Sequence, residues 1–299
     1  MMQALSGSLV ALVTPFEQGG DLDELALRRL VRRQVSEGTD GIIPCGTTGE
    51  GATLSEEETD RVVSAVLEEV NGRIPVIAGA GSNNTKVAVA RAARMRELGA
   101  DGVLSVAPYY NKPNQQGLFE HFKAVAEGGG LPVVVYNVPG RTASNILPET
   151  MVRLSELPNV VAVKEASGNL VQIMEILAGA PGLAVLSGDD ALTLPMMVLG
   201  AKGVISVAAN EAPRLMHELV RAGLDGDWAA AREHHFKLLP LMQANFLESN
   251  PIPVKGAMAL MGLVAENFRL PLVPPTQKTR SELQRILYGL GLLRPEEDR

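Results

Sequence analysis

Short apolar runs alternate with amphipathic segments along most of this chain. Eight runs are rich in Val and Ile with little polar alternation, as is typical of parallel strands buried on both faces: 9–16, 41–46, 74–81, 102–110, 132–139, 160–167, 183–190 and 203–210. Between them, helical periodicity predicts helices, for example over 23–38, 55–70 and 85–101. Ser55 begins a capping-box pattern, Thr85 is the expected N-cap of the third of these helices, and Gly99 is its expected C-cap.

Eight consecutive strand–helix units predict an α/β fold, a closed (β/α)8 or TIM barrel. An open doubly wound sheet is the alternative, but no break in composition divides the units. After the last predicted strand the chain has only helical patterns. We therefore expect a barrel over 1–224 and an appended C-terminal helical region over 225–299, ending in a solvated tail at 294–299.

Composition narrows the class of protein. The 299 residues are 46% apolar, which excludes a disordered chain, and the net charge of -7 without a basic cluster argues against nucleic-acid binding. The start of the chain has no basic segment, and its apolar run fits a first strand better than a signal peptide. No apolar run reaches the roughly 20 residues that are needed to span a bilayer. A single cysteine, Cys45, excludes an internal disulfide framework. These features predict a cytoplasmic protein without membrane segments.

Several candidate sites are weak. Cys45 is a possible nucleophile, but no histidine lies near it in the sequence, and a small buried residue is the favoured interpretation. Asp189 and Asp190 precede an apolar helix and are expected to cap it, although an acid/base pair is the alternative. The segment 79–85 lacks the third glycine of a dinucleotide loop. The histidines lie in helical patterns without metal-ligand spacing, so we expect surface positions, no metal and no cofactor: His121, His217, His234 and His235.

Polar residues gather where the predicted strands end, which is the catalytic end of such a barrel. Hydroxyl groups, one arginine and one lysine follow four of the strands: Thr47, Thr48, Tyr109, Tyr110, Tyr136, Arg141 and Lys164. The strand starts show no comparable collection. This asymmetry predicts an active site at the carboxyl ends of the strands.

Lys164 is the residue whose position most needs explaining, because it ends an apolar strand. Strand periodicity places Val160, Ala162 and Lys164 on one face, and the small Ala162 suits the crowded barrel interior. The same parity brings Tyr136 inward on the neighbouring strand. Desolvation and a nearby arginine would depress the pKa of the lysine, and a neutral amine attacks ketones to form an imine. The alternative is a lysine that reaches solvent.

Imine chemistry also needs proton transfer and anion binding. The Tyr136 hydroxyl can carry protons if Thr47 and Tyr110 link to it. The turn that contains Thr47 and Thr48 can hold an anion through hydroxyl and backbone N–H groups. Arg141 offers a planar fork for a second carboxylate.

The motifs `GTTGE`, `PYYNKP`, `YNVPGRT`, `VKEASGN`, `SGDD` and `GVISV`, in this order and spacing, resemble the dihydrodipicolinate synthase family. That family belongs to the pyruvate-dependent class I aldolases and lyases, which include N-acetylneuraminate lyase. The resemblance covers nearly the whole chain. It implies a (β/α)8 barrel with a C-terminal helical region, a homotetramer built as a dimer of tight dimers, and condensation of pyruvate with L-aspartate 4-semialdehyde in diaminopimelate and lysine biosynthesis.

The resemblance also implies roles for residues. By this resemblance Lys164 would be the Schiff-base lysine, Tyr136 the general acid/base and Thr47 the relay hydroxyl, and Tyr110 would be a relay residue that enters the partner's site across the dimer interface. Thr48 would bind the pyruvate carboxylate and Arg141 the carboxylate of the semialdehyde. Gly188 and Ile205 would line the imine pocket.

Family members that lysine inhibits bind it at the dimer interface. This chain keeps Asn83 and Tyr109 of that site, which also includes Ala52, but it departs elsewhere. It has Glu56 and Thr59 where the sensitive pattern has histidines, and Val87 where that pattern has a glutamate. We therefore expect lysine inhibition to be weak or absent.

Two other functions are compatible with the same residues. One is a related aldolase or lyase for another 2-keto acid, such as a keto-deoxy sugar acid or sialic acid; the `PGRT` arginine and `GTTGE` disfavour a sialic acid lyase. The other is a non-catalytic sensor of a small keto acid. Retention of Lys164, Tyr136, Thr47, Tyr110 and Arg141 argues against the sensor.

Overall fold

Each of the eight apolar runs contains or overlaps one strand. A computed structural model describes residues 5–293. The strands are β1 (Gly7–Ala11), β2 (Gly41–Ile43), β3 (Ile77–Gly79), β4 (Gly102–Val106), β5 (Val133–Asn137), β6 (Val160–Glu165), β7 (Ala184–Ser187) and β8 (Gly203–Ser206). Each strand is shorter than its predicted run, because most of the runs continue past the strand into the turn that follows it.

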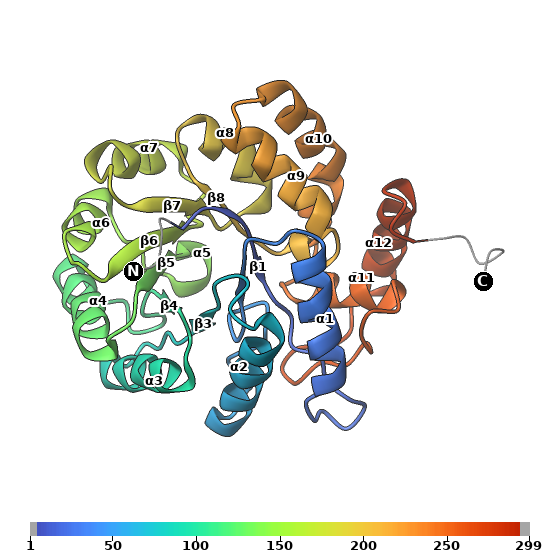
Figure 1. Cartoon of the computed structure of the whole chain (residues 1–299), viewed down its shortest axis with the longest axis horizontal. Helices are drawn as coiled ribbons and strands as arrows, with labels where there is room; N and C mark the ends of the chain where they lie inside the picture. Colours follow the sequence, from blue (N-terminus) through green and yellow to red (C-terminus); the bar gives the residue numbers. More distant parts are fainter. Residues whose placement is uncertain (1–4, 294–299) are drawn as a thin grey trace.

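The strands are all parallel and form a barrel, as Figure 1 shows. Their hydrogen-bonded order is β2-β1-β8-β7-β6-β5-β4-β3. The ring closes between β2 and β3 through a bridge of Ile42 with Val76 and a hydrogen bond of 2.9 Å from the Gly79 N–H to the Pro44 carbonyl. The predicted barrel is therefore confirmed, and the alternative of an open doubly wound sheet is wrong.

Helices surround the sheet in the alternation that the sequence predicts (Figure 1). They are α1 (Glu24–Ser36), α2 (Glu56–Val70), α3 (Thr85–Leu98), α4 (Gln115–Gly129), α5 (Pro139–Thr142), α6 (Pro148–Ser155), α7 (Leu170–Gly179), α8 (Thr193–Val198), α9 (Pro213–Leu224), α10 (Trp228–Ala244), α11 (Ile252–Leu260) and α12 (Gln277–Gly289), with 3-10 turns η1 (Asp190–Leu192) and η2 (Ala208–Asn210).

The capping residues predicted from the sequence lie at or within one residue of the helix ends in the structure. Ser55 and Glu58 form the predicted capping box of α2, and Gly99 ends α3 in the left-handed conformation with φ 96°. The prediction that Thr85 caps α3 is wrong by one residue. Asn84 is the N-cap, because its extended backbone lets the side-chain oxygen accept from the Lys86 N–H at 3.1 Å, and Thr85 is the first helical residue.

Two apolar clusters stabilise the barrel, one inside the ring and one between the ring and its helices. Ala162, Tyr136 and Ile205 belong to the interior cluster. Val160, however, packs in the outer cluster, so its predicted inward position is wrong. A register shift between β5 and β6 falls just after Val160 and breaks the strict alternation there, whereas Ala162 and Lys164 keep the inward parity.

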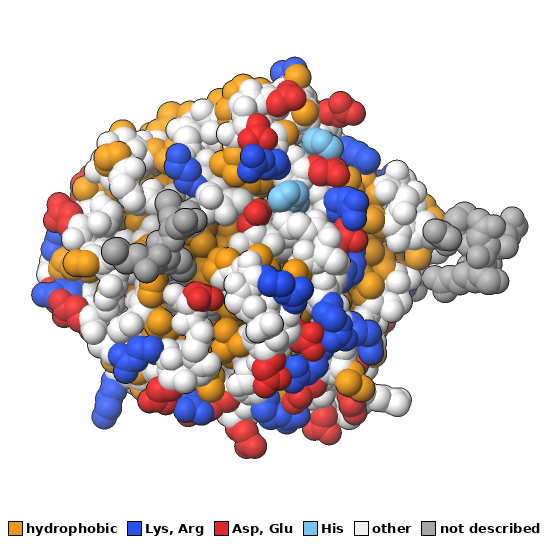
Figure 2. All heavy atoms as spheres, viewed as in Figure 1, with side chains coloured by type: hydrophobic (Ala, Val, Ile, Leu, Met, Phe, Trp, Pro, Cys, Tyr) orange, Lys and Arg blue, Asp and Glu red, His pale blue; other side chains and the backbone are white. Residues whose placement is uncertain are grey.

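After α9, helices α10, α11 and α12 extend the chain beyond the eight units, and α12 packs against both α10 and α11 (Figure 1). They fall within the predicted region 225–299, whose boundary stays a prediction, and the predicted tail 294–299 lies outside the described residues. Within residues 5–293, no helix combines the length and apolarity needed to cross a bilayer. On the face in Figure 2, side chains of both charges are interspersed.

Candidate active site

Lys164 and Tyr136 meet inside the mouth of the barrel. The two residues are register partners on β6 and β5, and the Lys164 Nζ lies 4.5 Å from the centroid of the Tyr136 ring. Both side chains are buried. Gly188, directly after β7, leaves room for the lysine, since a Cβ there would lie 3.0 Å from its Cγ and 3.1 Å from its Cε. The structure thus places Lys164 inward, as its parity predicts.

Burial changes the protonation of both groups. Desolvation lowers the pKa of the Lys164 ammonium to about 8, while the Asp190 carboxylate raises it and the Arg141 guanidinium lowers it. At neutral pH a usable share of the amine is therefore uncharged and nucleophilic. Burial raises the pKa of the Tyr136 phenol to about 12, against smaller lowering effects of Arg141 and a hydrogen bond with Thr47. The phenol therefore keeps its proton at neutral pH.

A cavity of about 130 Å³ opens beside these two side chains. Five of the predicted site residues besides Lys164 line it: Thr47, Thr48, Tyr136, Arg141 and Gly188. Together with Lys164 they come from two loops, one short helix and two strands, so only the barrel brings them together. Ile205 is not among the lining residues, because it is fully buried in the interior cluster.

The turn that follows β2 has an unusual backbone, which orients its two threonines differently. Cys45 and Glu50 have positive φ values of 57° and 51°, and Gly51 has no Cβ that would clash with the Cys45 carbonyl. The Thr14 hydroxyl donates to the Gly49 carbonyl at 2.7 Å and ties the turn to the end of β1. As a result, Thr47 is exposed toward the cavity while Thr48 is buried.

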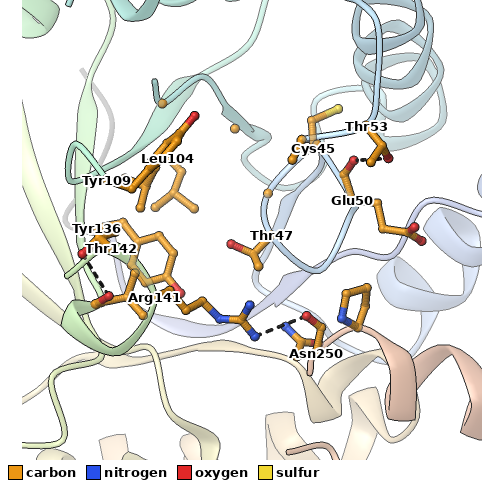
Figure 3. A pocket seen from close by; sticks show the side chains of 18 of the residues that line it. Cys45, Thr47, Glu50, Thr53, Leu104, Tyr109, Tyr136, Arg141, Thr142 and Asn250 are labelled. Atoms are coloured by element: carbon orange, nitrogen blue, oxygen red, sulfur yellow. Dashed lines mark hydrogen bonds between the residues drawn. The ribbon is translucent and has the colours of Figure 1, made fainter. Parts of the chain in front are cut away.

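Arg141 extends from the short helix α5 toward Asn250 (Figure 3). One of its terminal nitrogens donates to the Asn250 carbonyl at 3.2 Å. Its other terminal nitrogen lacks a hydrogen-bond partner within the described part of the chain. The guanidinium is exposed at the cavity mouth, where a free N–H group can bind a carboxylate.

Asn250 is the site residue that the sequence analysis missed. It lines the cavity, and its side-chain amide donates to the Thr48 hydroxyl at 3.0 Å. The signal was present in the stretch `NPIPVKGAM`, where an asparagine precedes two prolines at the start of α11. No local pattern, however, connects that stretch with the turn after β2.

Tyr110 does not reach the cavity of its own chain. Its side chain is 89% exposed, and its φ of 73° is a left-handed conformation that few tyrosines adopt. Neighbouring Tyr109 is partly exposed, and its carbonyl accepts from the Asn83 side chain at 3.1 Å. The described residues therefore leave the Tyr110 hydroxyl free at the surface.

Three of the six positions of the predicted lysine site line a larger cavity, of about 420 Å³, that adjoins the first. Ala52, Thr59 and Tyr109 line it, whereas Glu56, Asn83 and Val87 do not. The only carboxylate among the described lining residues belongs to Glu50, which is paired with Lys255 at 2.5 Å. This cavity therefore offers no unpaired carboxylate for an ammonium group.

Cys45 is buried, and desolvation raises the pKa of its thiol to about 12, so it is protonated at neutral pH. This agrees with the interpretation of a small buried residue and not with that of a nucleophile.

Asp189 caps η1 by accepting from the Ala191 N–H at 3.0 Å, as predicted for a capping residue. Asp190 instead accepts from the Val207 and Ala208 N–H groups, at 3.0 and 2.9 Å.

The expected surface position is wrong for two of the four histidines. His121 and His235 are buried and pack edge-on against Phe122 and Phe236. Neighbouring elements cover these positions, as α3 does at His121, whose Nδ1 lies 2.9 Å from the Thr85 hydroxyl oxygen, and sequence periodicity alone did not distinguish this. Over residues 5–293, no group of three or more His, Cys, Asp or Glu side chains is arranged to hold a metal ion.

Comparisons with known proteins agree with this geometry. A profile of the Dihydrodipicolinate synthetase family matches residues 4–289. The 4-hydroxy-tetrahydrodipicolinate synthase of Koribacter versatilis is 51% identical, over 97% of both chains, and that of Geotalea uraniireducens is 53% identical, over 96% of this chain and 99% of its own. The crystal structure of dihydrodipicolinate synthase from Aquifex aeolicus superimposes with a TM-score of 0.95 at 48% identity, covering 97% of this chain and all of that one. This chain therefore belongs to the dihydrodipicolinate synthetase family.

Proposed function

We propose that this protein condenses pyruvate with L-aspartate 4-semialdehyde, through a Schiff base on Lys164, to give 4-hydroxy-tetrahydrodipicolinate. This is a step of diaminopimelate and lysine biosynthesis, which we expect to take place in the cytoplasm. The observation that carries the proposal is the buried Lys164 amine, with its pKa lowered to about 8, against the Tyr136 ring in a small cavity. Because Arg141 provides a second anion site, it favours this reaction over other pyruvate-dependent aldolase reactions.

The first half of the reaction forms a nucleophile. The neutral Lys164 amine attacks C2 of pyruvate, and the ketone oxygen leaves as water after protonation, with Tyr136 as the donor. The protonated imine then accepts electrons when a proton leaves the pyruvate methyl group, which gives an enamine. Thr48 would hold the pyruvate carboxylate, and Thr47 would relay the protons from Tyr136.

The second half forms and releases the product. The enamine carbon attacks the aldehyde carbon of the semialdehyde, whose oxygen takes up a proton and becomes the 4-hydroxyl group. The amino group of the semialdehyde then attacks C2 and displaces the Lys164 amine, which closes the ring. One water molecule is released overall. Arg141 would bind the carboxylate of the semialdehyde and orient the aldehyde toward the enamine.

Borohydride trapping tests the first half. In the presence of pyruvate, reduction should add the mass of a reduced pyruvate imine to a peptide containing Lys164. A protein whose mass is unchanged would contradict the proposal and support the sensor. In a separate reaction without borohydride, pyruvate and L-aspartate 4-semialdehyde should give the cyclised product, whereas sialic acid should not be cleaved; cleavage would favour the related lyase.

We infer that the protein is a homotetramer, built as a dimer of tight dimers. In each tight dimer the Tyr110 side chain enters the active site of the partner subunit. Two features support this. The exposed Tyr110 side chain has no role in its own cavity. In addition, apolar side chains are exposed on α7, on α8 and directly after α8, which follow each other around the barrel in Figure 1: Val171, Met174, Val198 and Leu199.

Mixing inactive variants tests the shared site. A Tyr110→Phe chain with an intact Lys164 and a Lys164→Met chain with an intact Tyr110 should recover activity when they are unfolded and refolded together. Each mixed dimer would then contain one complete site. Activity no higher than that of the separate variants would contradict the sharing. Sedimentation of Val171→Asp should show dimers if α7 lies in the second interface.

We also infer that lysine inhibits this protein weakly or not at all. Val87 supplies no carboxylate, and the Glu50 carboxylate in the adjoining cavity is already paired. A lysine ammonium group would therefore be desolvated there without a counter-charge. Initial rates measured with increasing lysine test this inference, and half-inhibition below a millimolar concentration would contradict it.

A further inference from the structure

The C-terminal segment before α11 contacts both proposed carboxylate-binding residues at once. The Asn250 side chain donates to the Thr48 hydroxyl at 3.0 Å, and the Asn250 carbonyl accepts from Arg141 at 3.2 Å. Figure 3 shows Asn250 beside the Arg141 guanidinium. The contact with Thr48 joins residues 202 positions apart in the sequence. One asparagine therefore connects the two sides of the cavity.

The direction of the Asn250–Thr48 hydrogen bond has a chemical consequence. A hydroxyl group has one proton and two acceptor lone pairs. Because the amide N–H of Asn250 donates to the Thr48 oxygen, the Thr48 proton is free to point elsewhere. Both side chains are almost fully buried, and both residues line the cavity beside Lys164. The free proton is thus available to an anion bound in that cavity.

A buried ion pair fastens the turn after β2 to α11. Lys255, on the second turn of α11, lies 2.5 Å from the Glu50 carboxylate, and both side chains are fully buried. The Lys255 Nζ also lies over the rings of Phe16, at 4.4 Å, and Phe268, at 4.9 Å. Glu50 lies in the same turn as Thr47 and Thr48. The pair therefore fixes the distance between that turn and the segment of Asn250.

A buried ion pair is a poor means of stabilising a protein, because the desolvation of two charges offsets most of their attraction. An apolar pair of the same volume would stabilise the contact as well. What the charged pair adds is a single fixed distance and orientation. A fixed distance and orientation are useful here if the hydrogen bond between Asn250 and Thr48 must keep its geometry during the reaction.

We propose that Asn250, held in place by the Glu50–Lys255 ion pair, is a positioning residue that directs the Thr48 hydroxyl proton toward the substrate carboxylate and steadies Arg141 opposite it. This rests on the proposed function. It assigns to the C-terminal region a part in binding pyruvate, although no residue of that region touches the reacting atoms in the mechanism above.

A double-mutant cycle on pyruvate binding tests the action of Asn250 through Thr48. Asn250→Leu removes the donor at similar volume and should raise KM for pyruvate about tenfold, with a smaller change in kcat. In a Thr48→Val background, the same Asn250→Leu change should alter KM less than about twofold, because the hydroxyl it acts on is gone. An equal effect in both backgrounds, or none in either, would overturn the proposal.

A second set of variants covers the ion pair and any folding defect of the first set. Glu50→Gln with Lys255→Met replaces the pair by neutral groups and should fold, yet raise KM for pyruvate several-fold. The matched control, Arg221→Met with Asp225→Asn, removes an exposed ion pair on α9 and should leave KM unchanged. A wild-type KM in the Glu50/Lys255 variant would overturn the role of the pair.

Borohydride trapping of the wild-type protein distinguishes a failure of the proposed function from a failure of the positioning role of Asn250. If pyruvate and borohydride modify Lys164 in the wild type, the proposed function stands, and the variants above then decide the positioning role. If Lys164 of the wild type is not modified, the proposed function fails, and the positioning role fails with it. Circular dichroism of each variant shows whether a raised KM reflects unfolding.

Discussion

The depressed pKa of Lys164 makes a prediction about stability as well as reactivity. In the unfolded chain the ammonium has its ordinary pKa of 10.5, whereas burial in the barrel lowers it to about 8. The folded state therefore holds the proton less tightly than the unfolded state. We expect Lys164→Met, which keeps a long side chain but removes the charge, to be more stable than the wild type at neutral pH.

The size of the effect follows from the difference in pKa, about 2.5 units at 1.36 kcal/mol each, or about 3 kcal/mol. Below pH 8 the lysine is charged in both states, and the full destabilisation is present. Between pH 8 and 10.5 the unfolded state binds more protons, so the wild type gains stability as the pH rises. At pH 9.5 the remaining destabilisation is about 1 kcal/mol.

Urea unfolding at pH 7 and pH 9.5, followed by circular dichroism at one subunit concentration, measures this difference. The variant should exceed the wild type by about 3 kcal/mol at pH 7 and by about 1 kcal/mol at pH 9.5. Other titrating groups are common to both proteins and cancel in the comparison. The exposed Lys202 provides a control, since Lys202→Met should change stability by less than about 0.5 kcal/mol at either pH.

Two results would refute the reasoning. If Lys164→Met were less stable than the wild type at pH 7, the lysine would contribute net stability, and its pKa would not be depressed. If the variant were more stable by the same amount at both pH values, the gain would come from packing of the methionine and not from removal of a buried charge.

Three further predictions concern the site. Tyr136→Phe removes the buried proton donor and should lower kcat for condensation about a hundredfold or more, measured by product formation, with normal folding. Arg141→Met should raise KM for the semialdehyde more than KM for pyruvate and shift the pH profile of borohydride trapping upward, because the guanidinium lowers the pKa of Lys164. Cys45 should resist a thiol reagent at pH 8 in the native protein and react rapidly in denaturant, since its buried thiol has a pKa of about 12.

Local sequence patterns predicted many of the residues at the carboxyl ends of the strands. Runs of apolar residues located the strands, and strand parity placed Ala162 and Lys164 inside the barrel, because alternation on a strand is a geometric property of the extended backbone. Parity failed at Val160, where the neighbouring strand imposes a shift of register. Helical periodicity likewise did not show that His121 is buried, because burial depends on what packs against the helix.

The sequence by itself determined which elements form and which residues stand at the strand ends. Only the tertiary structure decided how those ends are joined to the rest of the chain. The contacts of Asn250 with Thr48 and of Lys255 with Glu50 span 202 and 205 positions and connect a C-terminal segment with the second strand–helix turn. Periodicity reports only on the few residues that share one helix or strand. Pairs so far apart are selected by the packing of the closed barrel, so their contacts appear only once the chain has folded.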